Sequence, residues 1–149
     1  MAKRLFWVLF LCWGFVSISQ AAEHEVRAVG VKFDPMFIII EPGDNVSWVN
    51  MPAHMIETID AMVPEGTEKI MTELGVDVNF TFDLEGIYVY KCTPHWGARM
   101  GGVMLVGNPS DIEGTIDAYL LEIQTDKSLL PAKGLLKKFK KHLQKQGVI

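Results

Sequence analysis

The chain has 149 residues, of which 49% are hydrophobic, and its 14 Lys and Arg against 18 Asp and Glu give a formal net charge of −4. This length allows one domain with a sizeable core. The acidic balance argues against a nucleic-acid partner, because such a partner requires a basic surface.

Residues 1–21 have the pattern of a secretory signal peptide. Two cations at positions 3 and 4 precede an apolar run that ends at Ile18, and Ser19-Gln20-Ala21 fits a small-x-small cleavage site. We expect the mature chain to begin near Ala22, to be periplasmic and to have no stable membrane insertion. An uncleaved anchor is the alternative, which the short apolar run disfavours.

Residues 22–108 read as an all-β domain of seven or eight short strands. Alternating or apolar runs are separated by Gly, Pro and Asp turn signals, and this spacing predicts a β-sandwich or closed barrel. The longest gap, Met62–Gly75, predicts a surface excursion with a helical turn over Thr67–Met71. The expected strands are Val26–Val31, Met36–Ile40, Val46–Val49, Met55–Ile59, Val78–Phe82, Ile87–Tyr90 and Val103–Val106.

Residues 109–149 change to a helical period and predict a two-helix extension. Ser110-Asp111-Ile112-Glu113 fits a capping box with Ser110 as the N-cap, and a second helix is expected near Ser128 with Pro131 in its first turn. The lysines of the second helix lie mostly opposite its apolar face. A membrane-surface helix would share this pattern, but we favour two helices packed on the barrel. The expected apolar faces are Ile112, Ile116, Tyr119 and Ile123, then Leu135, Leu136, Phe139 and Leu143.

The strongest chemical signal is the spacing Cys92-x2-His95-x4-Met100, with His54 far upstream. The mature chain has no second cysteine, so its thiol cannot form an internal disulfide. Two imidazoles, one thiolate and a weak thioether form the ligand set of a blue-copper site. We therefore expect one type 1 copper ion. Pro94 is expected to stiffen the loop and Gly97 to let the chain double back.

Two other chemistries use the same residue types. Structural zinc usually requires four firm ligands, and here a thioether would be the fourth. Nucleophilic catalysis by Cys92 with His95 as base has no evident carboxylate to orient the histidine. We expect the chain not to be an enzyme.

At these residues the sequence resembles the cupredoxins, and among them most the pseudoazurins. The resemblance implies a Greek-key sandwich, the ligands His54, Cys92, His95 and Met100, and electron transfer to a redox partner protein such as a reductase, oxidase or dehydrogenase. The matching stretches are Glu41-Pro42-Gly43-Asp44-Asn45-Val46, Glu57-Thr58-Ile59, Met62-Val63-Pro64-Glu65-Gly66, Lys91-Cys92-Thr93-Pro94-His95 and Met100-Gly101-Gly102-Val103.

The sequence departs from the family in three ways, the first of which is that Trp96 and Arg99 replace smaller or differently polar residues in the ligand loop. The residue after the first histidine is commonly an Asn that ties the ligand loops together, whereas here it is Met55. Pseudoazurins surround their site with lysines, whereas residues 22–110 carry thirteen acidic and five basic residues, a net charge of −8.

The electron is expected to leave through the edge of His95, within an apolar patch. The candidate patch residues are Trp96, Pro52 and Met55, with Met36 and Met51. We expect a monomer that shuttles single electrons. A periplasmic copper-binding or copper-tolerance protein is the alternative, because the surroundings are rich in methionine.

Overall fold

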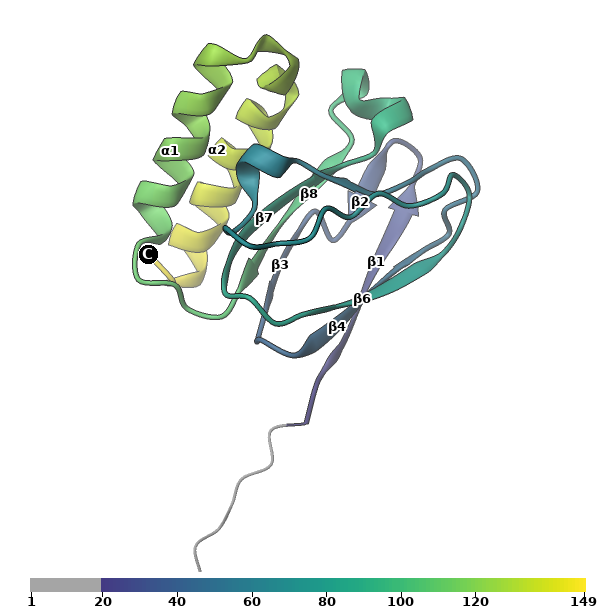
Figure 1. Ribbon diagram of the computed structural model, residues 1–149, viewed down its shortest axis with the longest axis horizontal. Helices are drawn as coiled ribbons and strands as arrows, with labels where there is room; N and C mark the ends of the chain where they lie inside the picture. Colours follow the sequence, from purple (N-terminus) through teal and green to yellow (C-terminus); the bar gives the residue numbers. More distant parts are fainter. Residues whose placement is uncertain (1–19) are drawn as a thin grey trace, which may run out of the picture.

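The computed structural model describes residues 20–149, so the signal-peptide prediction falls almost wholly outside the described residues. The rest forms a β-sandwich of two mixed four-stranded sheets with two helices on one side (Figure 1). The predicted all-β sandwich with a C-terminal two-helix extension is confirmed.

The first sheet has the strand order β2-β1-β4-β6, and the second has the order β3-β8-β7-β5. The pairs β1/β4 and β3/β8 are parallel, and the other pairs are antiparallel. The strands are β1 (Glu23–Val29), β2 (Lys32–Asp34), β3 (Phe37–Ile40), β4 (Asp44–Val49), β5 (Glu57–Thr58), β6 (Val78–Phe82), β7 (Gly86–Lys91) and β8 (Gly101–Val106).

Two local expectations about the strands and loops were wrong. The run Val26–Val31 is not one strand, because Gly30 has φ +57° and turns the chain from β1 into β2. The region Thr67–Met71 has no helical turn; Met71 instead forms a β-bridge with Glu57. A 3-10 turn, η1 (Asp60–Met62), precedes this region.

Alternation along the strands builds the first core, between the two sheets. Val26 and Ala28 of β1 and Val46 and Trp48 of β4 are buried, and the residues between them are more exposed. These side chains meet Tyr90 and others of the second sheet in one apolar cluster. A strand with a period of two thus places one face inward.

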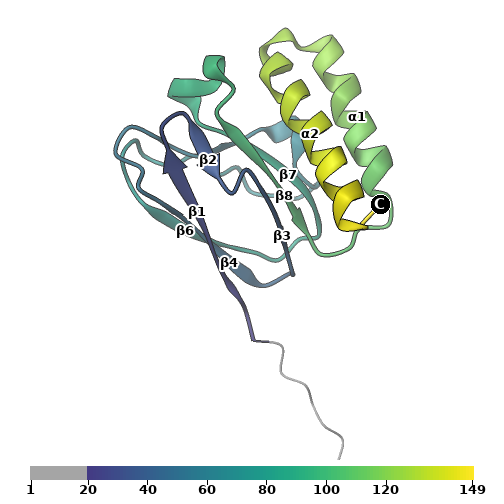
Figure 2. The same cartoon turned by 180° about the vertical axis from the view of Figure 1, so that it is seen from behind.

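The helices cover the outer face of the second sheet (Figures 1 and 2). They are α1 (Ile112–Thr125) and α2 (Leu130–Gln146), joined through a 3-10 turn, η3 (Lys127–Leu129). Asp111, and not Ser110, caps α1, because its side chain accepts from the Gly114 N–H at 2.8 Å. The apolar faces of both helices form a second core with outward residues of β7 and β8. All six residues of β8 are therefore buried.

Among residues 20–149, no helix combines the length and apolar character that crossing a bilayer requires.

Candidate metal centre

The loop that carries three of the four expected ligands begins where β7 ends. Cys92 follows Lys91 directly, and the 3-10 segment η2 (Thr93–Ala98) follows Cys92 with Pro94 in its first turn. The His95 N–H donates to the Cys92 carbonyl at 3.0 Å, and the Met100 N–H donates to the His95 carbonyl at 3.2 Å. These bonds fold the loop back on itself before β8 starts.

The reversal of this loop depends on Arg99 and not on Gly97. Arg99 has φ +65°, in the left-handed region, and its N–H reaches the carbonyl of Trp96 at 2.8 Å. Gly97 has no positive φ, and an added Cβ would meet nothing within 4 Å. The expected role of Gly97 is thus wrong. Gly101 and Gly102 are the restricted positions. A Cβ at Gly101 would lie 2.7 Å from the Tyr90 carbonyl oxygen, and a Cβ at Gly102 would clash with the Tyr90 hydroxyl.

His54 comes from a different part of the chain, between β4 and β5. Its N–H donates to the Met51 carbonyl at 2.9 Å, and its carbonyl accepts from the Gly75 N–H at 2.9 Å. The Met51 N–H in turn donates to the Asp77 carboxylate at 3.0 Å. Hydrogen bonds to Met51 and Gly75 therefore hold this loop around His54.

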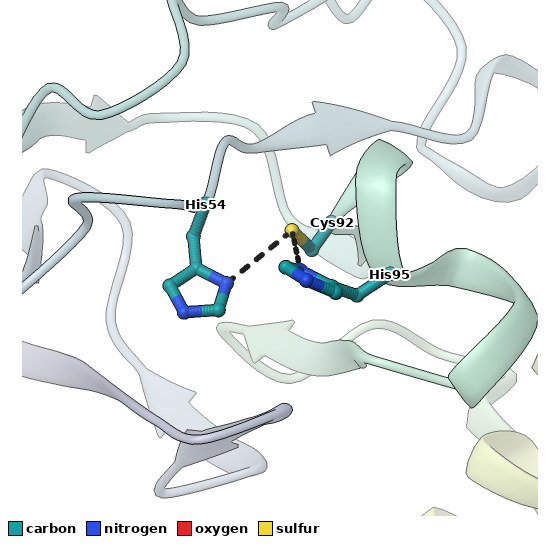
Figure 3. Close-up of side chains that lie close together, drawn as sticks. All are labelled: His54, Cys92 and His95. Atoms are coloured by element: carbon teal, nitrogen blue, oxygen red, sulfur yellow. Dashed lines mark hydrogen bonds between the residues drawn. The ribbon is translucent and has the colours of Figure 1, made fainter.

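The fold brings the two histidines and the cysteine together, as Figure 3 shows. The Cys92 sulfur lies 3.7 Å from Nδ1 of His54 and 3.5 Å from Nδ1 of His95. All three donor atoms lie within 4.8 Å of one another. Cys92 and His54 are buried, and His95 is partly exposed.

These distances fit a metal ion at the centre of the three donors. A first-row metal bound at about 2.3 Å from sulfur and about 2.0 Å from nitrogen, with trigonal angles, separates those two atoms by roughly 3.7 Å. No carboxylate belongs to the cluster in the described residues. A set of one thiolate and two imidazoles suits copper better than calcium or magnesium, which prefer oxygen ligands.

A backbone hydrogen bond joins Met100 to Cys92. The Cys92 N–H donates to the Met100 carbonyl at 2.9 Å, and the Met100 side chain is 1% exposed. Both residues belong to the core between the sheets. Met100 is thus buried beside Cys92, and its role as the weak fourth ligand stays a prediction.

Electrostatics favour the metal-binding form of His54. Burial, together with the charge of the neighbouring His95, lowers the pKa of the His54 imidazole. The two rings lie 4.9 Å apart between centroids. A neutral imidazole is the form that binds a metal.

The expected electron-transfer patch is only partly at the surface. Pro52 is exposed and His95 and Trp96 are partly exposed, but Met55 is 9% exposed and Met51 is fully buried. Trp96 also contacts the helical extension, because its Nε1–H donates a hydrogen bond to the Ser128 carbonyl at 3.1 Å. The methionines that suggested copper handling are therefore mostly core residues.

Sequence reasoning gave no role to a group of polar residues beside the centre. Glu57 on β5 contacts Thr93 and Lys91 of the cysteine loop. A carboxylate inside the mostly apolar run Met55–Ile59 is the sequence signal that could have singled it out.

Comparison with known proteins agrees with this geometry. The model of the family "Copper binding proteins, plastocyanin/azurin family" matches residues 20–107. A pseudoazurin from Paracoccus pantotrophus is 35% identical over 108 residues, which cover 67% of this chain and 74% of the relative.

Two solved pseudoazurins have similar structures. That of Methylobacterium extorquens AM1 superposes with a TM-score of 0.61 at 28% identity, covering 75% of this chain and 97% of the other. That of Hyphomicrobium denitrificans gives a TM-score of 0.57 at 31% identity, covering 66% and 82%.

Proposed function

The chain belongs to the plastocyanin/azurin family of copper-binding proteins, and from this premise we propose that it is a periplasmic one-electron carrier with a single type 1 copper. The convergence of the Cys92 sulfur and two Nδ1 atoms carries the proposal. The proposed ligands are His54, Cys92, His95 and, as the weak axial one, Met100.

Copper, when bound, supplies a one-electron couple between Cu(II) and Cu(I). A soft thiolate suits Cu(I), whereas imidazole suits both oxidation states, so the mixed donor set can bind copper in either oxidation state. The chain keeps these donors in place: Cys92 is fixed by the pairing of β7 and by the Met100 carbonyl, and His54 by two backbone bonds. Little rearrangement on changing charge makes electron transfer fast.

The proposed exit is the partly exposed edge of His95. Pro52 and Trp96 flank the route in this proposal, and the partner is a reductase, oxidase or dehydrogenase that meets a monomer of this chain. Such redox encounters bury little area and rely on apolar contact with electrostatic steering.

Export completes the proposal. Residues 1–21 act as a cleaved signal peptide, 22–108 as the copper domain and 109–149 as its extension. The intact mass of protein recovered from the periplasm should correspond to a chain that starts near Ala22. A full-length mass in the membrane fraction would contradict cleavage.

A visible absorption spectrum tests the centre directly. The copper-loaded protein should show an intense thiolate-to-copper band that bleaches on reduction and recovers on reoxidation. Cys92→Ser should abolish the band, because it removes the thiolate, while circular dichroism shows a folded chain. Met71→Leu, which changes a methionine that is 64% exposed, is the matched control and should keep the band.

Three outcomes would contradict the proposal. A colourless copper-loaded protein, or a band that survives in Cys92→Ser, would exclude the type 1 site. Loss of copper on each reduction would instead favour a copper-binding protein over an electron carrier.

A further inference from the structure

Within residues 20–149, the backbone joins the two ligand loops through a short strand pairing. Strand β5 pairs with β7 through two residue pairs, Glu57 with Lys91 and Thr58 with Tyr90. His54 lies three residues before β5, and Cys92 directly follows β7. The distance between these two ligands therefore depends on a ladder that, at two residues, is weak alone.

The Glu57 side chain reinforces this ladder. Its Oε2 accepts a hydrogen bond from the Thr93 hydroxyl and lies 3.2 Å from Nζ of Lys91. Its Oε1 lies 3.5 Å from Nζ of Lys69, which belongs to the excursion after η1. Thr93 stands between Cys92 and Pro94, so the carboxylate reaches into the ligand loop itself.

Burial distinguishes Glu57 from an ordinary surface ion pair. Exposed pairs contribute little to stability, but the Glu57 side chain is only 14% exposed and both of its oxygens have partners. The carboxylate therefore lies mostly out of water, although Thr93, which donates to it, is exposed. A hydrogen bond to an ionised acceptor is stronger than one between neutral groups, so it constrains Thr93.

No other side-chain hydrogen bond in residues 20–149 joins these loops, apart from the sulfur contacts of Cys92. Met55, next to His54, is buried and offers only a weak thioether acceptor. The link between the loops therefore passes through Glu57.

We propose that Glu57 is a positioning residue of the metal centre, whose carboxylate clamps Thr93 and so fixes Cys92 relative to His54. The inference rests on the proposed copper site. It assigns to Glu57 the outer-shell function that hydrogen-bond partners of metal ligands generally have, which is to orient the ligand and tune the metal.

Four variants separate positioning from simple stability. Glu57→Ala removes the clamp, Glu57→Gln keeps an acceptor for Thr93 but not the charge, and Thr93→Val removes the donor. Asp60→Ala is the matched control, because Asp60 pairs with the same Lys69 at 3.4 Å, is 65% exposed and does not touch the cysteine loop. The readouts are the visible and electron paramagnetic resonance spectra, the reduction potential, the rate of copper loss to a chelator and the unfolding temperature of the apoprotein.

Glu57→Ala and Thr93→Val should each lose copper about tenfold faster or more and change the spectrum and potential. The double variant should be little worse than either one, because both remove the same interaction. Glu57→Gln should retain most of the native spectrum, and Asp60→Ala should match the unmodified protein.

The inference is overturned if folded Glu57→Ala keeps the native spectrum, potential and copper-loss rate. It is also overturned if the variant lowers the unfolding temperature of the apoprotein without changing the spectrum, since that is a structural effect alone. If Glu57→Ala does not fold, Thr93→Val decides by the same criteria. Failure of the unmodified protein to show a thiolate-to-copper band would instead contradict the proposed function.

Discussion

At the scale of single residues, Asp44 joins the start of the described chain to the sandwich. Its carboxylate accepts from the Ala22 N–H at 2.7 Å and from the Glu41 N–H at 3.0 Å, and it lies 2.8 Å from Nε2 of His24. These hydrogen bonds, the one from Ala22 first, hold the pKa of Asp44 below its ordinary value of 3.8, although burial acts in the opposite direction. The ionised form is therefore the one that the fold stabilises.

Replacement of Asp44 by Asn should lower the free energy of unfolding at neutral pH by about 1–3 kcal/mol, because the N–H groups of Ala22 and Glu41 then lose a charged acceptor. The folded pKa lies below the unfolded one, so the contribution is complete above the unfolded pKa and is lost as the pH falls through the folded pKa. The difference from the unmodified protein should thus shrink below about pH 4. Urea unfolding measured across acidic pH checks this.

Glu68→Gln is the control for this experiment, because Glu68 is exposed and has no side-chain partner among the described residues. It should leave stability nearly unchanged at every pH. A deficit of Asp44→Asn that stays constant into strong acid would show that the charge of Asp44 is not what stabilises the fold.

At the scale of elements, the helical extension is part of the core and not an appendage. The residues of β7 and β8 that face away from the first core pack on α1 and α2. Phe139 of α2 is fully buried in this second core, and the centroid of its ring lies 5.5 Å from that of Phe37. Without the helices, this face of the second sheet would be an exposed apolar surface.

Phe139→Ala should therefore lower the free energy of unfolding by about 3–5 kcal/mol, the usual cost of a cavity left by a buried aromatic ring. Lys137→Ala, on the exposed side of the same helix, should change it by less than about 0.5 kcal/mol. Chemical unfolding of both variants measures the difference. Equal stability of the two would mean that the extension contributes little to the core.

Sequence patterns located most elements because their periods are strong. The alternation Val-Asn-Phe-Thr-Phe gave β6 its observed bounds, Val78–Phe82, and the spacing of buried Ile112, Ile116 and Ile123 gave α1. The hairpin of β1 and β2 was missed because a glycine turn interrupts one apolar run. The region Thr67–Met71 was misread because its backbone bonds go to β5, a long-range pairing without a local signal.

The sequence was sufficient to predict the donor residues of the metal centre, but not the residues that hold those donors in place. Cys92 and His95 follow a fixed spacing, so their type and order were sufficient to predict that they lie together with His54. Met100 as the fourth ligand stays a prediction. Glu57 obeys no spacing rule, and only the folded chain places it against Thr93. The burial of Met51 and Met55 was equally hidden, because the sequence of a loop does not tell which side chains turn inward.

At the scale of the whole molecule, charge is divided between the two parts of the fold. Residues 22–110 carry a net charge of −8, whereas residues 111–149 carry five acidic and seven basic residues, a net charge of +2. Helix α2, which carries exposed lysines, lies against the second sheet on its outer side (Figure 2). The sandwich around the metal centre is thus the acidic part.

The net negative charge of the sandwich should favour a basic partner. Electron exchange with a basic c-type cytochrome should slow by about tenfold or more between low and physiological ionic strength, because salt screens the attraction that steers the encounter. Stopped-flow kinetics at several salt concentrations measure this. A rate that rises with salt would show that the cytochrome meets the basic helices or that repulsion governs the encounter.

A charge placed beside the exit distinguishes the proposed route from general attraction. Pro52→Lys, at an exposed position two residues before His54, should slow exchange with the basic cytochrome several-fold, while the copper band and stability stay unchanged. Leu121→Lys adds the same charge on α1, at a side chain that is 61% exposed, and should slow exchange far less because it lies on the helical side. Equal effects of the two variants would mean that only net charge matters, and the electron would then not be assigned to the His95 edge.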